Sequence, residues 1–228
     1  REAVTRLAAA GRTAVAVQGD VTDPGDVARL VAAALDAYGR VDVLVNNAAM
    51  IVPPAPGVDG SRRGDHPLEL TSYEDWVQIW QRTLATNLLG PANLTWCVAR
   101  QMIDVPPADG VPVGRVVNVG SRGAYRGEPD IPAYGASKAG LHSFGQSMAQ
   151  RLAPHGIAVT SIAPGFIETE MVGAALEGAA GEATRAQSPF HRVATPQEVA
   201  AAVVTLASPD AEWASGAVLD FNGASHLR

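Results

Sequence analysis

Short apolar runs alternate with amphipathic stretches along the whole chain. Four runs are typical of strands buried on both faces of a sheet, because they are short and mostly apolar. They are residues 41–45, 115–119, 157–163 and 216–221. Residues 13–19 are also short and β-branched, and they predict a further strand. This alternation predicts parallel strands joined by crossover helices, which is an α/β fold.

The first amphipathic stretch between these runs has a complete set of helix signals. Its apolar residues recur three and four positions apart between Val27 and Tyr38. Asp23 supplies a capping side chain, and Pro24 follows it at the first helical position. Gly39 stands where the end of a helix favours a left-handed residue. We therefore expect one helix between these two signals, with its apolar side facing a sheet.

Similar patterns predict the remaining helices. Residues 72–102 have a helical pattern and form either one helix or two pieces. Residues 133–152 predict another helix, which Pro154 ends because proline cannot continue it. Residues 195–198 combine a capping box with a proline at the first helical position, so a helix is expected to run to about Ala207.

Residues 51–67 are rich in proline, glycine and charge, and they predict a long loop with a function or mobility of its own. No internal repeat or low-complexity linker interrupts the 228 residues. A chain of this length, with 47% hydrophobic and 18% charged residues, can bury one sizeable core. We therefore expect a single domain over residues 1–228.

The net charge of the chain limits the classes of partner that it is expected to bind. A formal net charge of −6 and a pI near 5.3 give a field that repels phosphate backbones and anionic membranes. No stretch reaches the roughly 18 consecutive apolar residues that a membrane span needs, and residues 1–10 lack the apolar core of a signal peptide. Neither a nucleic acid nor a membrane is therefore expected as a partner, and a small molecule is.

Cysteine and histidine add two expectations. The single cysteine, Cys97, cannot form an internal disulfide, which suits a reducing cytoplasm. The five histidines show no metal-ligand spacing, so no metal site is expected.

Tyr134 and Lys138 are the strongest candidates for catalysis. The two residues are four positions apart on a predicted helix, so their side chains project from the same face of it. A free tyrosine titrates at about 10, and a nearby ammonium lowers the pKa because it favours the phenolate. Ser121 ends a predicted strand, where side chains face the ligand crevice of a parallel sheet. Its hydroxyl can stabilise the charge that develops on a substrate carbonyl during hydride transfer.

These residues also have plain structural interpretations. A Tyr-x-x-x-Lys pair occurs by chance in many helices, and a serine after a strand is usually a turn residue. Gly135 and Gly140 favour the catalytic interpretation over the structural one. Glycine inside a helix lowers helix stability by about 1 kcal/mol relative to alanine, so its presence needs a reason. Their presence indicates a close approach by another group.

The segment from Tyr134 to Gly140 resembles the Y-x-x-x-K active-site motif of the short-chain dehydrogenase/reductase family. Any one motif is a weak signal, but several in the family's order and spacing are strong, and together they span essentially the whole chain. The other matching positions are Asp20-Val21, Asn46-Asn47-Ala48-Ala49 (with alanine where the family has glycine), Asn87, Ser121 and Pro164-Gly165-Phe166-Ile167-Glu168-Thr169. The resemblance implies a doubly wound, Rossmann-like parallel sheet in three α/β/α layers.

The resemblance also implies a function: an NAD(P)-dependent oxidoreductase that interconverts a carbonyl and a secondary alcohol. Tyr134 is then the general acid and base, and Lys138 lowers its pKa and binds the nicotinamide ribose. Ser121 orients the carbonyl, and Asn87 holds a water that relays protons. The residues implied to contact NAD or NADP are Asp20, Val21, Asn47, Ala48, Ala49, Tyr134, Lys138, Pro164, Gly165, Ile167 and Thr169.

Three of these assignments have structural alternatives. Asn87 can be a helix-kink residue that bonds to backbone, Asp20 can belong to a turn before a helix, and Thr169 can cap the next helix. The family's substrates are bound by the loops that correspond here to residues 51–67, which resemble the family's loop plus an insertion, and 171–192. The chain resembles 3-oxoacyl-thioester reductases and general secondary-alcohol dehydrogenases equally well.

The family's first strand and its glycine-rich turn, whose helix N-terminus binds pyrophosphate, have no match in this sequence. In the doubly wound order, the first two strands separate residues 13–19 from residues 41–45. We therefore expect the domain to be N-terminally incomplete, with roughly 40 further residues in the working polypeptide. The choice between NAD and NADP depends on residues in that same region.

Arg122 and Arg126 follow the candidate serine and can attract an anionic substrate, although solvated surface arginines are the commoner case. By family resemblance, helices over residues 72–102 and 133–152 form the interface of a homotetramer or homodimer, which residues 216–228 join. A rival interpretation is a non-catalytic dinucleotide-binding or regulatory protein that has kept the fold.

Overall fold

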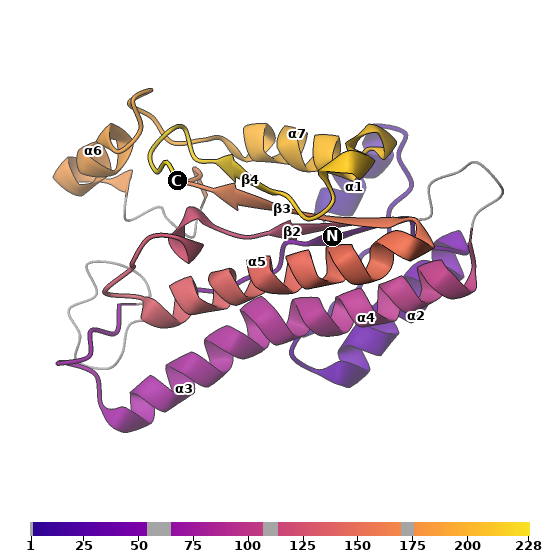
Figure 1. Cartoon of the computed structure of the whole chain (residues 1–228), viewed down its shortest axis with the longest axis horizontal. Coiled ribbons are helices and arrows are strands. Elements are labelled where there is room, and N and C mark those ends of the chain that lie inside the picture. Colours follow the sequence, from indigo (N-terminus) through magenta and orange to yellow (C-terminus); the bar gives the residue numbers. More distant parts are fainter. Residues whose placement is uncertain (1, 54–64, 107–113, 170–175) are drawn as a thin grey trace.

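A computed structural model of the chain describes residues 2–53, 65–106, 114–169 and 176–228. Within these ranges four parallel strands form one sheet, in the order β1-β2-β3-β4. The strands are β1 (Val43–Asn46), β2 (Gly114–Val119), β3 (Ile157–Pro164) and β4 (Val218–Phe221). All four fall within about two residues of the apolar runs that predicted them. This parallel sheet with flanking helices confirms the α/β fold (Figure 1).

Helices cover both faces of the sheet, with α3, α4 and α5 on one side and α7 on the other (Figure 1). The helices are α1 (Glu2–Ala9), α2 (Pro24–Tyr38), α3 (Tyr73–Leu84), α4 (Gly90–Asp104), α5 (Pro132–Leu152), α6 (Gly178–Ala186) and α7 (Pro196–Ala207). Short 3-10 turns cover Arg122–Ala124, Ala153–His155 and Pro209–Ala214.

The predicted helix ends of α2 and α7 are confirmed. The Asp23 carboxylate accepts a hydrogen bond of 2.8 Å from the backbone of Asp26, and Gly39 ends α2 with a φ of 79°. At α7, Thr195 Oγ1 accepts from the Glu198 N–H at 3.2 Å, while the Glu198 carboxylate accepts from the Thr195 N–H at 2.8 Å. These ends were predictable because capping depends on residues only three positions apart.

The stretch predicted over residues 72–102 is one continuous rod with a widened turn. A π-helical segment, Ala85–Leu89, joins α3 to α4 without a break in the chain direction (Figure 1). Such π-turns insert one residue into a helix and are frequently found at functional sites. Asn87 lies at the middle of this turn and is fully buried.

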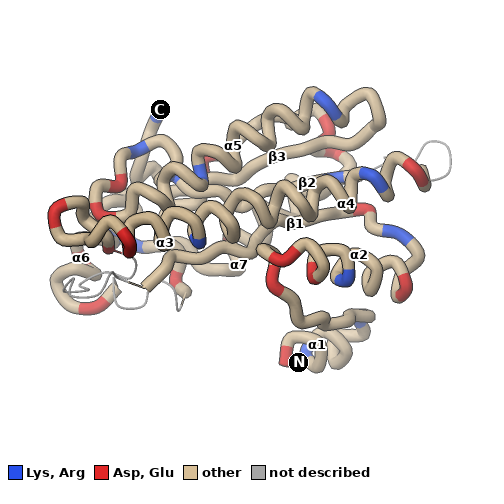
Figure 2. Tube along the Cα trace, turned by 90° about the horizontal axis from the view of Figure 1, so that it is seen from below, with Lys and Arg blue, Asp and Glu red and all other residues tan. Residues whose placement is uncertain are grey.

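The strand predicted at residues 13–19 is wrong, because this segment does not form a strand. A strand requires a hydrogen-bonded neighbour, and no strand within the described ranges lies beside this segment. Val15 is 51% exposed, so the apolar side chains of the segment do not enter the core either. Figure 2 shows α1 set apart from the sheet, beyond the edge that β1 forms.

The core lies in two layers, one on each side of the sheet. Val116 packs with Val98 and Met102 of α4 on one face, and Val117 packs with Val199 and Leu206 of α7 on the other. Successive strand residues point to opposite faces, which explains why neighbouring valines enter different layers. All eight residues of β3 are buried. The sheet therefore presents the loops at the carboxyl ends of its strands as a rigid edge.

Candidate active site

Ser121 lies at this edge, immediately after β2. Its backbone is extended (φ −166°, ψ 151°), and its Oγ accepts a hydrogen bond of 3.0 Å from the Gly123 N–H. Ser121 thus caps the short turn Arg122–Ala124, as the plain structural interpretation expected. Because the backbone N–H occupies a lone pair of the oxygen, the hydroxyl proton remains available for another acceptor.

Tyr134 and Lys138 project from the first turns of α5 toward Ser121. The Ser121 hydroxyl lies close enough to Tyr134 to lower the pKa of its phenol. Lys138 Nζ lies 5.9 Å from the centroid of the Tyr134 ring. The three residues that the sequence singled out therefore meet in one place, although thirteen positions separate Ser121 from the tyrosine.

Burial governs the proton affinities of this group. It raises the pKa of Tyr134 above its ordinary value, while the hydrogen bond from Ser121 lowers it and the charge of Glu128 raises it. Burial lowers the pKa of Lys138 to about 8. The implied lowering of the Tyr134 pKa by Lys138 stays a prediction. Burial has the largest influence on this pKa, because it removes the phenolate from water.

Lys138 retains donors that a cofactor can use. Lys138 is 2% exposed, and its ammonium donates a hydrogen bond of 2.8 Å to the carbonyl oxygen of Val119. Within the described ranges its other two N–H groups have no acceptor, and a buried ammonium without acceptors is costly. The hydroxyl oxygens of a ribose are suitable acceptors, so the residues here fit the nicotinamide half of NAD or NADP.

Asn87 bridges the π-turn to two neighbouring segments. Its Oδ1 accepts from the Met50 N–H at 2.8 Å, and its Nδ2 donates to the Met50 carbonyl at 3.0 Å and to Ser137 Oγ at 3.1 Å. Asn87 thus bonds to backbone, as its alternative interpretation expected, and it does so beside the residue that precedes Lys138. Its implied role in a proton relay stays a prediction.

The segment after β1 divides into a buried and an exposed part. Asn46 is 4% exposed, and its Nδ2 donates to Thr95 Oγ1 at 3.0 Å and to Asn118 Oδ1 at 2.9 Å. This amide network joins β1, α4 and β2, and sequence analysis missed it, although an asparagine within the apolar run of β2 was a visible signal. Asn47 and Ala48 are exposed at the carboxyl end of β1, and Ala49 is half-buried. All three stay predicted cofactor contacts.

Asp20 and Val21 precede α2 and lie near α4. Asp20 Oδ1 accepts from the Thr22 N–H at 2.9 Å, which is the turn that its alternative interpretation expected. The exposed Asp20 carboxylate lines a cavity of about 520 Å³. A β-carbon on Gly90 would come 2.9 Å from Cγ2 of Val21, so the glycine permits this close approach. Contact with an adenine ring stays a prediction for both residues.

The segment after β3 is bound to the segments that follow α6 and β4. The Gly165 N–H donates to the Phe221 carbonyl at 3.1 Å, directly after the buried Pro164. Ile167 pairs with Ala194 in an isolated parallel bridge. Thr169 is exposed, and its Oγ1 lies 3.5 Å from the Ile167 carbonyl. These contacts hold the segment at the same edge as Ser121.

The two expected substrate loops are described only in part. Residues 54–64 of the first and 171–175 of the second lie outside the described residues. The end of the first loop contacts the residue before Tyr134, because His66 Nε2 accepts a hydrogen bond of 3.5 Å from the Ala133 N–H. His66 itself is buried, with an exposed fraction of 1%. The His66 N–H also donates to the Asp130 carbonyl at 2.8 Å.

Two buried side chains lie beside the site. Sequence analysis did not identify His142, and it favoured a solvated surface position for Arg122. His142, one turn beyond Lys138, is 3% exposed, and burial together with the charges of Lys138 and Arg228 lowers its pKa to about 4. Its ring stacks on Tyr125 with centroids 5.1 Å apart. Arg122 is 5% exposed, so its interpretation as a solvated surface residue is wrong. Its neighbour Arg126 has a side chain that is 36% exposed.

Across the described ranges, none of the helices combines the length and apolarity needed to cross a bilayer. Among those residues, no three His, Cys, Asp or Glu side chains are grouped so that they could hold a metal ion.

Known proteins resemble this chain in sequence and in overall structure. A family model described as enoyl-(acyl carrier protein) reductase, within the short-chain dehydrogenase/reductase family, matches residues 1–226. The 3-oxoacyl-[acyl-carrier-protein] reductase FabG of Vibrio cholerae is 36% identical over 208 residues, which are 91% of this chain and 76% of that protein.

Two solved structures have the same fold. The crystal structure of gox2181 superposes with a TM-score of 0.84 at 29% identity, covering 98% of this chain and 80% of that one. The structure of ElxO with NADP bound gives a TM-score of 0.75 at 26% identity, covering 92% of this chain and 77% of that one. The chain thus belongs to the short-chain dehydrogenase/reductase family of NAD(P)-dependent oxidoreductases.

Proposed function

We propose that this protein interconverts a 3-oxoacyl thioester and the corresponding secondary alcohol, with Tyr134 as the general acid and base. The convergence of Ser121, Tyr134 and Lys138 at the carboxyl edge of the sheet is the observation that supports this most directly. The thioester substrate is suggested by the name of the Vibrio cholerae relative. A general secondary-alcohol substrate is the other possibility, and the substrate panel described below distinguishes the two.

A nicotinamide held beside Tyr134 would supply or accept the hydride. In the direction of reduction, Tyr134 donates its phenolic proton to the carbonyl oxygen as that oxygen becomes a hydroxyl. Ser121 donates a hydrogen bond to the same oxygen and stabilises the negative charge that develops on it. The Ser121 hydroxyl has one proton, so it lowers the pKa of Tyr134 in the absence of substrate and donates to the carbonyl oxygen once substrate is bound.

Lys138 has two functions in this proposal. Its N–H donors that are not bonded to Val119 would bind the nicotinamide ribose. Its pKa of about 8 lies close to neutral pH, so Lys138 can return a proton toward Tyr134 after each turnover. Asn47, Ala48, Ala49, Gly165, Ile167 and Thr169 would hold the rest of the nicotinamide half, while Asp20 and Val21 would contact the adenine. Asn87 would fix a water for the proton relay from its position beside Ser137.

Replacement of the catalytic hydroxyl tests this proposal. Tyr134→Phe removes the proton donor and is expected to reduce turnover about 10²- to 10⁴-fold. Cofactor binding, measured by fluorescence of the reduced nicotinamide, should persist. Tyr125→Phe is the matched control, because it also removes one phenol hydroxyl and retains its ring against His142. It is expected to keep its activity.

The assay uses the full polypeptide with NADH or NADPH and compares acetoacetyl-CoA with simple ketones. Preference for acetoacetyl-CoA supports the thioester substrate, and preference for simple ketones contradicts it. Undiminished turnover by Tyr134→Phe would refute the catalytic role of the phenol. Cofactor binding without turnover by the unmodified protein would favour the non-catalytic rival.

We also propose that the protein is a cytoplasmic homotetramer or homodimer. The outer surface of the rod formed by α3, the π-turn and α4 exposes large apolar side chains, with Leu89 55% and Trp96 68% exposed. Large apolar side chains that are exposed together on one surface can mark association sites. Light scattering should give a dimer or tetramer mass, and Trp96→Glu should reduce it. A monomeric unmodified protein would contradict this assembly.

A further inference from the structure

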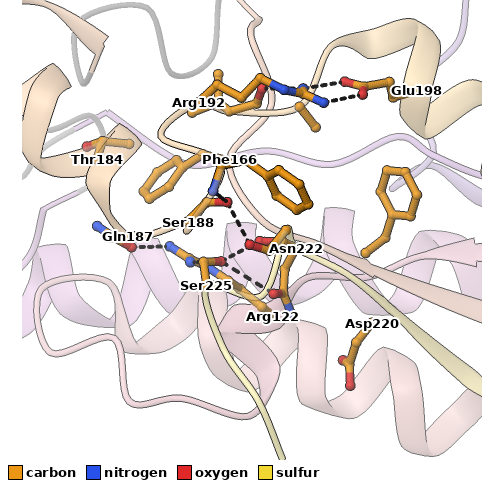
Figure 3. Close-up of a pocket in the computed structure, with 15 residues that line it drawn as sticks. Arg122, Phe166, Thr184, Gln187, Ser188, Arg192, Glu198, Asp220, Asn222 and Ser225 are labelled. Atoms are coloured by element: carbon orange, nitrogen blue, oxygen red, sulfur yellow. Dashed lines mark hydrogen bonds and ion pairs between the residues drawn. The ribbon is translucent and has the colours of Figure 1, made fainter.

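A cavity of about 260 Å³ lies at the carboxyl ends of β3 and β4 (Figure 3). Four segments that are far apart in the sequence enclose it. Arg122 comes from the turn after β2, Phe166 from the segment after β3, Gln187 from the segment after α6, and Asn222 and Ser225 from the segment after β4. None of the proposed catalytic residues lines this cavity.

Arg122 is the buried charge of the cavity. Its Nη2 donates a hydrogen bond of 2.5 Å to Gln187 Oε1, and its Nη1 donates to Ser225 Oγ. Its guanidinium lies 4.9 Å from the centroid of the Phe166 ring. These three partners are an amide, a hydroxyl and an aromatic ring, and none of them is charged.

Each carboxylate near Arg122 already has another cationic partner. Glu128 raises the pKa of Arg122 by its charge, but it is ion-paired with Arg126 at 3.5 Å. Glu198 lines the cavity and forms two bonds with Arg192, at 2.6 and 2.8 Å. Figure 3 shows this pair at the opposite end of the cavity from Arg122.

Asp220, the remaining carboxylate of the cavity wall, is bound to Arg228 at 2.9 Å. With Glu198 and Asp220 both neutralised by their partners, the cavity keeps one net positive charge, which is that of Arg122. A buried cation normally has an anionic partner, because its desolvation is otherwise uncompensated. Burial indeed lowers the pKa of Arg122.

The shape and donors of this site favour a carboxylate. A guanidinium presents a planar fork of N–H donors that matches the two oxygens of a carboxylate. One net positive charge is balanced by one carboxylate group. Since drug-sized ligands occupy cavities of about 300–1,000 Å³, a cavity of about 260 Å³ suits a small acid or the end of a longer one.

The cavity is next to the proposed catalytic group but separate from it. Arg122 lines the cavity, whereas Ser121, which directly precedes it, does not. We propose that this cavity binds a small carboxylate anion through the guanidinium of Arg122. The anion is either a free organic acid or the carboxylate end of a substrate.

Calorimetric titration of the full polypeptide with butyrate tests this site, with butyramide as the neutral isostere. Butyrate is expected to bind and butyramide to bind about tenfold more weakly or not at all, because a charge-assisted hydrogen bond contributes more than a neutral one. Arg122→Gln should weaken butyrate binding about tenfold or more. Arg151→Gln, which removes an exposed arginine near the end of α5 that does not line the cavity, is the matched control and should bind butyrate normally.

Equal binding of butyrate by the unmodified protein and Arg122→Gln would overturn the proposal, as would equal binding of butyrate and butyramide. Circular dichroism shows whether Arg122→Gln is folded. If it is not, the comparison of butyrate with butyramide on the unmodified protein decides the question alone.

Inhibition kinetics then distinguish the two sources of the carboxylate. Butyrate that competes with a keto acid but not with a neutral ketone identifies the substrate's own carboxylate, whereas the same effect on both substrates identifies a separate ligand. The calorimetric result requires no turnover, so failure of the proposed oxidoreductase reaction leaves it interpretable.

Discussion

The imidazole of His142 lies directly against the backbone of Gly120, so that a β-carbon on the glycine would come 1.8 Å from Nε2. Gly120 is the residue between β2 and Ser121, and His142 lies one helical turn beyond Lys138. This contact therefore sets how closely α5 approaches the end of β2, and with it the separation of Ser121 from the side chains of α5.

Gly120→Ala should destabilise the protein, because the imidazole is buried and has no room to move away. Overpacking of this kind costs about 1–3 kcal/mol, and it should lower the midpoint of urea unfolding. Gly127→Ala is the control, since no heavy atom lies within 4 Å of its added carbon. Equal stability of the two variants would show that the contact is not restrictive.

His142 should make the protein sensitive to acid. Its pKa is lowered to about 4 in the folded protein, so between pH 6.5 and 4 the unfolded chain binds a proton that the folded protein does not. Stability must therefore fall as the pH falls through this window, by up to about 3 kcal/mol. His142→Phe keeps a ring against Tyr125 and removes this titration.

Urea unfolding of both proteins between pH 7 and 4 measures the effect. The free energy of unfolding should decrease more steeply for the unmodified protein than for His142→Phe. Parallel pH profiles would contradict the assignment of this acid sensitivity to His142.

Lys138 should produce a pH dependence at the alkaline end. Burial lowers its pKa to about 8, whereas the unfolded chain keeps this proton up to about 10.5. Above pH 8 the unfolded chain binds more protons, so the stability of the unmodified protein should rise with pH relative to Lys138→Met. The limit of this rise is about 3 kcal/mol, and unfolding curves between pH 7.5 and 9.5 would reveal it. A constant difference between the two proteins over that range would contradict the lowered pKa.

The adjacent residues Asn46 and Asn47 should respond differently to alanine. Asn46→Ala leaves Thr95 Oγ1 and Asn118 Oδ1 without the donor that they share, at a cost of about 1–3 kcal/mol. Asn47→Ala removes an exposed side chain that is predicted to contact the cofactor, so it should weaken NAD(P)H binding and leave stability unchanged. Thermal unfolding and cofactor titration of both variants separate the two roles. Loss of stability in Asn47→Ala would contradict this division.

Sequence patterns located most of the fold because they depend on residues close together. The capping box of Thr195 and Glu198 and the left-handed Gly39 act within one helical turn. The four strands were found because strands buried on both faces are apolar runs. The segment at residues 13–19 has the same composition, but composition does not supply the neighbouring strand that a ladder needs.

The candidate catalytic group was also visible in the sequence, because Tyr134 and Lys138 share a helix face wherever that helix packs. Their proton affinities were not visible. The sequence shows that Lys138 is one helical turn from Tyr134. The pKa of Tyr134, however, depends first on how much water the folded chain excludes from the phenol.

Arg122 shows the same division between sequence and tertiary structure. Its place after Ser121 is a property of the sequence, and an arginine in a loop is ordinarily solvated. Its burial depends on Gln187 and Ser225, which are 65 and 103 positions away along the chain. The sequence alone thus determined most of the elements, the ends of α2 and α7, and the residues on one helix face. Only the tertiary structure decided which polar groups lost their water, because desolvation is imposed by segments that meet only when the chain has folded.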